Sequence, residues 1–490
     1  MASPEAKRSG SGPTTTATDS IAGAFGPGLG WVDPPKGLVL EQVHFLARHG
    51  ERTPVRTRLR HLFPERWNLC HAGRKFGAAV LDLTPDAPDS SRAEAKFGKL
   101  GSELSGAAGT MRVERVVEGV DEKEAPRAGD NGECLLGELT DLGRISTLRL
   151  GKELRKLYVV RLGLLPSRLE QKDRGMIYFR STNMSRTIES LQQEIRGLLP
   201  QTAEHDPSGI VPQILIRNGT NENLLPNTFG CSRLRALDRA FADAAARALN
   251  PKLEEIDHKI VPHTDGIPPR VDGHPRLNGI LDTVRAAEAH GLPVPAPLLE
   301  DSSIKLMESA IVSEWFSGYQ AEDPNRRGEF RRLAMGRLLE DLNGRMQNKA
   351  RLGDKDPLKF ALYSTHDTAL AGLLSTLDCF DNRWPTFTAT VGIELFKDTF
   401  SSPSIFSKAQ SAVDSMLGKQ QSAPGHYVRL RYGNRTLQLP GCAPKGKHLA
   451  GSPEFCTLDA FRDIVNSLRH PQGLSWEREC EIGRGEKSSK

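Results

Sequence analysis

Three short polar segments carry the residues of this chain that are best suited to chemistry. The first, residues 48–54, reads RHGERTP and follows a short apolar run. Arg48 and Arg52 present planar forks of donors that match phosphate oxygens and stay charged at any ordinary pH. His49 can act as a neutral nucleophile in the physiological range. Because a phosphate monoester hydrolyses very slowly unaided, a site must both attack it and spread its charge. We therefore interpret this segment as a candidate phosphoryl-transfer site.

The second and third segments add groups of the same kind. Residues 180–187, RSTNMSRT, precede a stretch with apolar residues on one helical face. Free backbone N–H groups and the helix dipole favour an anion at such a helix start. Residues 364–368, STHDT, contain His366 and Asp367. The alkoxide that leaves a phosphate monoester is a strong base, so a carboxylic acid such as Asp367 is needed near it.

Simpler explanations compete for some of these residues. A single His-Asp pair caps a helix more often than it catalyses, and only its position after an apolar run favours catalysis here. Arg180, at the end of the second run, fits a structural clamp as well as it fits a ligand. Arg56, Arg58 and Arg60 are best explained as a solvated basic face.

The three segments together resemble the RHGxRxP, RSTxxxRT and HD motifs of the histidine acid phosphatases, the larger-cap branch of the histidine phosphatase superfamily. The resemblance extends over most of residues 38–480. It implies a phosphohistidine intermediate on His49 and a proton donor at Asp367. The phosphate ligands that it implies are Arg48, Arg52, Arg186 and His366. Residues 224–227 and 380–385 look most like the lysophosphatidic acid phosphatase group.

The function that the resemblance implies is hydrolysis of a phosphate monoester without a metal or any other cofactor, since the arginines do the charge work of a Mg²⁺ ion. We expect a small or lipid monoester such as lysophosphatidic acid as the substrate, and the highest activity below neutral pH. The alternative is a catalytically weak binding or scaffold protein of the same fold. A phosphomutase is a third possibility, but the helical insert and the His-Asp pair argue against it.

The elements that position these segments are short strands, each followed by a helix. Apolar runs end directly before the three segments, at 43–47, 176–179 and 358–363. Ligands of an open α/β sheet collect at the carboxyl ends of its strands, so the three segments should meet there. Further strands are expected at 211–216, 390–396 and 426–432, with a turn at 434–436, a helix capped by Thr140 or Asp141 and a closing helix at 458–468.

This pattern predicts an α/β fold in which a sheet core flanked by helices carries an inserted, mainly α-helical cap subdomain. The resemblance implies that the core is phosphoglycerate-mutase-like. Helix-forming stretches separated by Pro and Gly define the cap. The expected order is a disordered segment at 1–36, a first core part at 37–230 with a surface insertion at 83–132, the cap at 231–356, a second core part at 357–482 and a flexible tail at 483–490.

Composition limits the partners. The chain has 490 residues, which is long enough for two or more structural units. Its formal net charge of +5 is mild, and no basic patch is interleaved with aromatic residues, so nucleic acid is not predicted as a partner. No apolar run is long enough to cross a bilayer. The predicted partner is the phosphate monoester, and the sequence does not determine the oligomeric state.

The cysteines give two opposing indications. There are 7, with no CxxC pair, so a zinc site is not predicted. The odd number, without an apolar N-terminal signal, favours mostly reduced thiols and a cytoplasmic or mitochondrial location over secretion. The family resemblance instead implies the disulfides Cys231–Cys480 and Cys442–Cys456.

Overall fold

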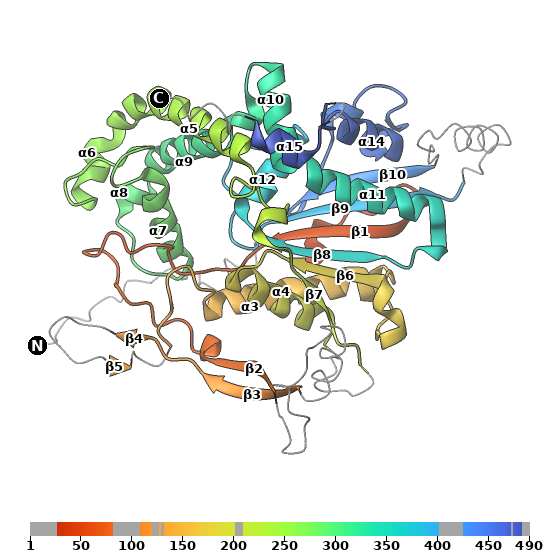
Figure 1. Ribbon diagram of the computed structural model, residues 1–490, viewed down its shortest axis with the longest axis horizontal. Helices are drawn as coiled ribbons and strands as arrows, with labels where there is room; N and C mark the ends of the chain where they lie inside the picture. Colours follow the sequence, from red (N-terminus) through yellow and green to blue (C-terminus); the bar gives the residue numbers. More distant parts are fainter. Residues whose placement is uncertain are drawn as a thin grey trace, which may run out of the picture.

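A computed structural model describes residues 27–81, 108–119, 127–128, 132–200, 209–400, 425–471 and 474–482. Its centre is a nine-stranded sheet in the order β12-β13-β10-β9-β1-β8-β6-β7, with β11 paired to β10. The strands are β1 (Leu38–Arg48), β6 (Ile177–Ser181), β7 (Ile214–Leu215), β8 (Phe360–Thr365), β9 (Thr390–Asp398), β10 (His426–Tyr432), β11 (Arg435–Leu437), β12 (His448–Leu449) and β13 (Ser452–Thr457). Figure 1 shows these strands as one continuous layer with helices on both sides.

The strands that end in the three polar segments are neighbours in this sheet. β1 runs parallel to β8, and β8 runs parallel to β6. Arg48 lies opposite Thr365, and Ser181 lies opposite Ser364, so the strands end at the same level. The other half of the sheet, from β9 onward, is antiparallel. The expected meeting of the segments at one sheet edge is therefore confirmed.

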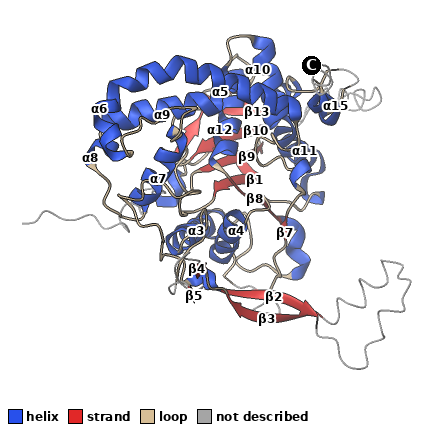
Figure 2. Ribbon diagram, turned by 60° about the vertical axis from the view of Figure 1, so that its left-hand side comes forward, coloured by secondary structure: helices blue, strands red, loops and turns tan. Residues whose placement is uncertain are grey.

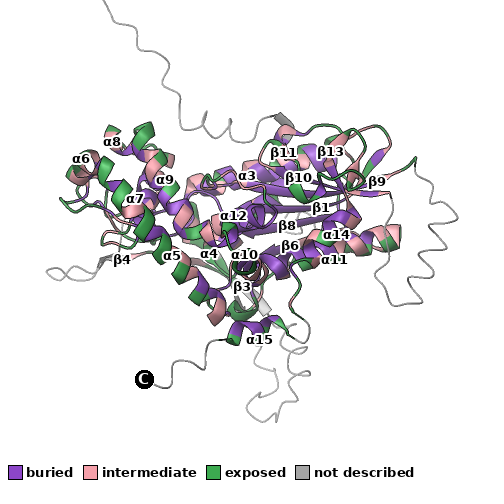
Figure 3. Cartoon of the chain, turned by 90° about the horizontal axis from the view of Figure 1, so that it is seen from above, coloured by how far each residue is buried: buried purple, intermediate pink, exposed green. Residues whose placement is uncertain are grey.

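Both faces of the sheet are buried, which explains why the central strands read as apolar runs. Phe45 packs into a cluster with helices α3 and α4, whereas its neighbour Leu46 packs into a cluster on the opposite face. The helices that cover the two faces are α3 (Asp141–Leu154) and α4 (Ser185–Leu198) on one side, and α11 (Arg337–Leu352), α12 (Asp367–Thr376) and α14 (Leu458–Asn466) on the other. Figure 3 shows the central strands largely in purple, as buried.

A group of helices beside the sheet forms the helical insert. Its members are α5 (Ser232–Leu253), α6 (Asp257–Ile260), α7 (Leu277–Ala289), α8 (Ala296–Leu299) and α9 (Asp301–Phe316), drawn green at the left of Figure 1. They share a third core cluster with Leu59, Phe63 and Trp67, which follow the first motif. After α10 (Pro324–Arg331), α11 returns to cover the sheet. The division of the chain at 231 and 356 remains a prediction.

Several expectations for the peripheral segments need correction. Residues 27–36 were assigned to the disordered segment, but Trp31 is 8% exposed and packs edge-on to Tyr158 at 6.2 Å. Within the expected surface insertion, β3 (Ala108–Glu114) is a strand that pairs antiparallel with β2 (Lys75–Leu81), which precedes the insertion, and the pair lies below the helices in Figure 2. Residues 1–26, 82–107, 120–126, 129–131 and 483–490 lie outside the described residues.

Other element boundaries differ slightly from expectation. The strand expected at 211–216 is limited to β7, because only Ile214 and Leu215 pair with β6. The turn expected at 434–436 is shorter, since Arg435 already pairs with Tyr432 in β11. Thr140 is the N-cap of α3, as one of the two expected alternatives, and its side chain accepts a hydrogen bond from the Gly143 N–H. Short pairs β4 (Glu118–Gly119) with β5 (Arg127–Ala128), and helix α15 (Trp476–Glu481), complete the described elements.

Three disulfides join six of the cysteines, and Cys379 is the one free thiol. The pairs are Cys70–Cys134, Cys231–Cys480 and Cys442–Cys456. The expectation of mostly reduced thiols is therefore wrong, because an odd total says nothing about which sulfurs the fold brings together. Such pairs are typical of oxidising compartments, and the expected cytoplasmic or mitochondrial location stays a prediction. In the described part of the chain, no helix is long and apolar enough to cross a bilayer.

Candidate active site

The nucleophile candidate His49 is held in one tautomer at the end of β1. Its side chain is buried, and Nδ1 lies 2.9 Å from the carbonyl oxygen of Gly50. Because a carbonyl can only accept, Nδ1 carries the proton and Nε2 keeps a free lone pair. Burial, and then the charges of Arg48 and Arg52, hold the pKa of His49 well below its ordinary value of 6.5. His49 is therefore a neutral imidazole with Nε2 available for attack.

The loop that follows His49 is fixed by a close contact with the start of α3. A Cβ on Gly143 would lie 2.2 Å from the carbonyl oxygen of Glu51, and a Cβ on Gly50 would lie 2.4 Å from that of Gly143. The same Glu51 oxygen accepts a hydrogen bond from the Thr140 N–H at 3.0 Å. Two glycines are therefore needed where the loop touches the helix, so the segment around Thr140 has a structural role.

Three guanidinium groups surround the histidine. The Nε atoms of Arg48, Arg52 and Arg186 are all buried, and none has a hydrogen-bond partner among the described residues. The pKa of Arg48 and the pKa of Arg186 are each lowered to about 10. Burial is the largest cause, and the charge of Arg52 lowers both pKa values further. Buried donors without partners are costly, so this cluster is suited to hold an anion that would complete its hydrogen bonds.

His366 and Asp367 lie at the start of α12, as the sequence predicted for a strand–motif–helix unit. The rings of His366 and His49 are 5.6 Å apart, and Nε2 of His366 lies 3.0 Å from the hydroxyl of Thr182. Burial, and then the charge of Arg186, lowers the pKa of His366 to about 3.

Both oxygens of the Asp367 carboxylate accept hydrogen bonds. Oδ1 accepts from the Thr368 N–H at 2.8 Å, and Oδ2 accepts from Arg48 at 2.7 Å and from the indole N–H of Trp384 at 3.0 Å. Burial acts to raise the pKa of Asp367, but the charges of Arg48, Arg52 and His366 outweigh it and the pKa is lowered. In the free protein Asp367 is therefore stabilised as a carboxylate.

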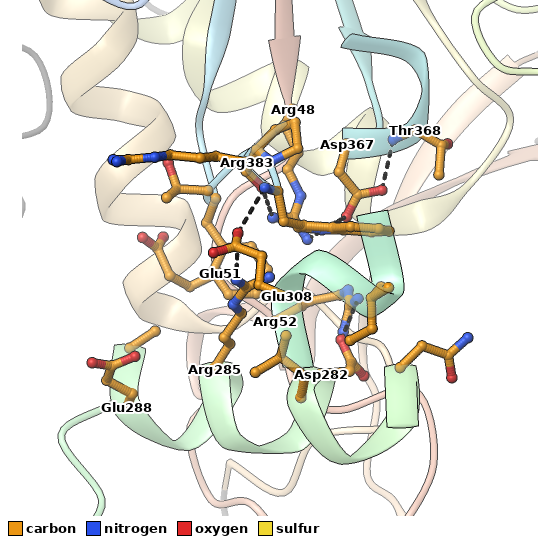
Figure 4. A pocket seen from close by; sticks show the side chains of 18 of the residues that line it. Arg48, Glu51, Arg52, Asp282, Arg285, Glu288, Glu308, Asp367, Thr368 and Arg383 are labelled. Atoms are coloured by element: carbon orange, nitrogen blue, oxygen red, sulfur yellow. Dashed lines mark hydrogen bonds and ion pairs between the residues drawn. The ribbon is translucent and has the colours of Figure 1, made fainter. Parts of the chain in front are cut away.

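A cavity of about 1010 Å³ opens next to these groups. Figure 4 shows Arg48 and Asp367 on its sheet side and Arg52 beside Asp282 on its cap side. Arg48, Arg52 and Asp367 line the cavity, whereas His49, His366 and Arg186 stand next to them without bordering it. Apolar side chains form much of the remaining wall, among them Leu281, Ile311, Trp384 and Phe387. The site can thus take an anionic head with an organic group of considerable size attached.

Cap residues that the sequence did not identify reach this site. Asp282 on α7 pairs with Arg52 at 2.9 Å and accepts from the Val55 N–H at 3.2 Å. Glu308 on α9 accepts from Arg285 at 2.8 Å. Amphipathic helices contain many such charged residues, and no local signal separates these from solvent-exposed ones.

The arginines that flank the motifs differ in their surroundings. Arg180 is buried and is held by Glu222 and, at 2.7 Å, by Asn223, so it is a structural residue. Arg58 was expected on a solvated face but lines the cavity, with its guanidinium where a Cβ on Gly279 would collide. Arg56 and Arg60 are exposed, as expected.

No group of three or more His, Cys, Asp or Glu side chains in the described ranges is placed to hold a metal ion. The buried donor groups of this site come instead from arginine and histidine side chains. Such a set binds phosphate oxygens through N–H groups.

Comparison with known proteins agrees with this geometry. The family model for the histidine phosphatase superfamily (branch 2) matches residues 39–433. A probable acid phosphatase of Schizosaccharomyces pombe is 34% identical over 466 residues, which are 89% of this chain and 94% of that protein. The lysophosphatidic acid phosphatase type 6 of Homo sapiens is 29% identical over 273 residues, which are 54% of this chain and 58% of that protein.

A solved structure extends the likeness to the fold. The apo phytase of Hafnia alvei has a TM-score of 0.52 and 14% identity, and the match covers 90% of this chain and 100% of that one. These matches confirm the expected family and the α/β fold class with flanking helices. The chain belongs to the histidine phosphatase superfamily, branch 2, and groups with its acid phosphatases.

Proposed function

We propose that this protein hydrolyses phosphate monoesters through a phosphohistidine formed on His49. One observation carries the proposal. A neutral imidazole with Nε2 free lies among three guanidinium groups, and the buried Nε donors of these groups lack partners among the described residues. A phosphoryl group at this position would accept those donors while Nε2 attacks it. Charge dispersal and nucleophilic attack are the two requirements of this reaction.

The first step transfers the phosphoryl group to the protein. Nε2 of His49 attacks phosphorus in line, and the bond from phosphorus to the ester oxygen breaks with its electron pair on that oxygen. Arg48, Arg52, Arg186 and His366 hold the remaining phosphate oxygens. Asp367 gives its proton to the leaving oxygen, which departs as an alcohol.

The second step restores the enzyme. Water attacks the phosphohistidine while Asp367, now a carboxylate, accepts one proton from that water. The bond between Nε2 and phosphorus breaks, inorganic phosphate is released and Asp367 is protonated again. Each group of this mechanism lies on the chain itself, so we propose that hydrolysis does not depend on a metal ion.

The charge state of Asp367 determines the pH range. Arg48, Arg52 and His366 lower the pKa of Asp367 in the free protein, whereas the acid role requires it to be protonated. A dianionic substrate among the arginines offsets their charges and raises this pKa again. We therefore expect the highest activity in acid.

The cavity wall favours a substrate with an apolar part. Leu281, Ile311 and Phe387 lie on this wall, and a volume of about 1010 Å³ exceeds what a phosphate group alone would fill. A relative at 29% identity is named a lysophosphatidic acid phosphatase. We propose a small or lipid phosphate monoester, such as lysophosphatidic acid, as the substrate class.

Release of inorganic phosphate from an aryl phosphate tests the proposed reaction. Wild type and His49→Ala are compared from acid to neutral pH, with and without a chelator, after circular dichroism shows that both are folded. We expect chelator-resistant release that is highest in acid and absent from the variant. Substantial release by His49→Ala would reject the nucleophile assignment, and no release by folded wild type would favour a binding or scaffold role.

A further inference from the structure

The two oxygens of the Asp367 carboxylate have different surroundings. Oδ2 accepts two charged or polar donors, Nη2 of Arg48 at 2.7 Å and the indole Nε1–H of Trp384 at 3.0 Å. Oδ1 accepts one, the backbone N–H of Thr368 at 2.8 Å. Each oxygen of a carboxylate can accept about two hydrogen bonds, so donors occupy both acceptor positions of Oδ2 and one acceptor position of Oδ1. Oδ1 is thus the oxygen left to carry a proton.

Trp384 is itself held by the cap. Its backbone N–H donates to Oε1 of Glu308 at 2.7 Å, and the same oxygen accepts from Nη2 of Arg285 at 2.8 Å. The indole ring lies edge-on to Trp315, with centroids 6.0 Å apart, and also packs on Phe316 at 5.4 Å. Helices α7 and α9 therefore fix the position from which the indole N–H reaches the carboxylate.

We propose that Trp384 is a positioning residue that turns the Asp367 carboxyl group so that Oδ1 delivers the proton to the leaving oxygen, and that the cap holds Trp384 in place through Glu308. This inference rests on the proposed function. It gives the cap a part in proton transfer as well as in forming the cavity wall. Trp384 lies in the segment 380–385 that the sequence set apart from the three motifs.

Several charged groups act on Asp367 and stay in place when the indole is changed. They are Arg48 at the end of β1, Arg52 in the loop after it, Arg186 on α4, and His366 at the start of α12. Replacing Trp384 by Phe keeps an aromatic ring but removes the N–H donor, together with some ring volume that the control variant below loses as well. The carboxylate loses one stabilising hydrogen bond, so the pKa of Asp367 rises. The carboxyl group is also free to turn, which impairs proton delivery.

The test compares Trp384→Phe with Trp31→Phe. Trp31 is a matched control, because its indole N–H also donates to a carboxylate, that of Asp33 at 2.9 Å, and it does not line the cavity. We expect Trp384→Phe to lower kcat/KM about tenfold for an alkyl phosphate and less than about threefold for an aryl phosphate, whose leaving group needs little protonation. We expect no change for Trp31→Phe. Equal losses on both substrates, or none, would overturn the proposal.

A second measurement does not depend on turnover. Carboxyl ¹³C resonances of aspartate-labelled protein are titrated, and the Asp367 signal is assigned by its absence in Asp367→Asn. In Trp384→Phe the Asp367 titration should move to higher pH by about one unit, and in Trp31→Phe it should not move. An unmoved titration in Trp384→Phe rejects the positioning role even if wild type proves inactive, whereas an inactive wild type with a moved titration rejects only the proposed function.

Discussion

At the scale of single residues, the proposed mechanism uses the same charges to bind the phosphate and to set the state of the nucleophile. Arg48, Arg52 and Arg186 each oppose protonation of His49, in addition to its burial. An isolated histidine would be largely charged, and so unable to attack, in the acid range where Asp367 must hold a proton. The guanidinium groups resolve this conflict, because they keep His49 neutral at a pH where the substrate keeps Asp367 protonated.

The pH dependence of kcat/KM follows from this arrangement. Since the pKa of His49 lies well below 6.5, the imidazole stays neutral as the pH falls through 6.5 and below. We expect kcat/KM for an aryl phosphate to hold or rise between about pH 7 and pH 5, because kcat/KM reports groups of the free enzyme. Initial rates across this range check the prediction. A fall centred between pH 6 and 7 on the acid side would mean that His49 becomes protonated there.

Removing the acid should separate the two chemical steps. Asp367→Asn keeps a side chain of the same size but offers no carboxylic proton. We expect kcat/KM for an alkyl phosphate to fall about 10²- to 10⁴-fold, as is usual for loss of a general acid. An aryl phosphate should still phosphorylate His49, so that a burst of the phenol precedes slow turnover. Stopped-flow measurement of the burst checks this, and equal losses for both leaving groups would speak against an acid role.

At the scale of elements, helix α7 joins the cap to the phosphate-binding loop through Asp282. Its carboxylate takes one donor from Arg52 and one from the Val55 N–H. In the free protein Asp282 is therefore an internal anion beside the position of the phosphate. Its charge would repel a phosphate bound as proposed, whereas its hydrogen bond holds Arg52 in place.

Asp282→Asn should improve the binding of inorganic phosphate. The amide keeps an acceptor for one of the donors but removes a negative charge next to the site, which we expect to lower the inhibition constant of phosphate about fivefold. Competitive inhibition of the reaction by phosphate at constant pH measures this inhibition constant. Asp257→Asn is the control, because Asp257 also pairs with a cap arginine, Arg270, at 2.6 Å and does not line the cavity. Weaker phosphate binding by Asp282→Asn would show that orienting Arg52 is its larger effect.

The contact between the motif loop and α3 makes a second prediction at this scale. Gly143→Ala places a methyl group 2.2 Å from a backbone oxygen that cannot move aside without shifting Glu51. We expect lower stability and loss of most activity. Gly344→Ala in α11 is the matched control, since nothing lies within 4 Å of its Cβ and alanine is favoured over glycine in a helix by up to about 1 kcal/mol. Thermal unfolding of both variants tests the contrast, and equal melting temperatures would contradict it.

The elements near the motifs could be predicted from the sequence for a simple reason. Short apolar runs that end in RHGERTP, RSTNMSRT and STHDT leave only one sheet edge at which parallel strands can present them. Thr140 and the apolar period after it likewise define the start of α3. The hairpin β2–β3 could not be predicted, because the small residues of KFGAAVL show no alternation. Asp282 and Glu308 gain their roles only when α7 and α9 pack against the sheet edge.

The sulfur pairs illustrate the same limit for long-range contacts. Spacing gave no reason to join Cys70 to Cys134, which are 64 residues apart. Their approach follows from backbone hydrogen bonds between the segments, Cys70 N–H to Gly132 and Cys134 N–H to Trp67, both at 2.8 Å. Pairing of this kind depends on the completed fold and not on local sequence.

At the scale of the whole molecule, one disulfide closes the chain around the helical insert. Cys231 precedes α5 at the entry to the cap, and Cys480 lies in α15, at a sequence separation of 249. The hydroxyl of Ser232 also donates to the Cys480 carbonyl at 2.6 Å. This link joins the last helix to the first helix of the cap. In the unfolded chain it closes a very long loop and so restricts the conformations of that chain.

Removing this disulfide should lower stability far more than it lowers activity. In the loop-closure model, a crosslink over a loop this long contributes about 5–6 kcal/mol by restricting the unfolded chain, and the site residues lie in other elements. We expect the double variant Cys231→Ser/Cys480→Ser to melt several degrees lower while kcat below the melting range stays close to that of wild type. Cys379→Ser is the control, because Cys379 is a half-buried free thiol whose replacement breaks no crosslink. Equal melting of the double variant and the control would mean that packing of α15 alone fastens the two regions, and a selective loss of kcat would mean that the disulfide also maintains the position of the cap over the site.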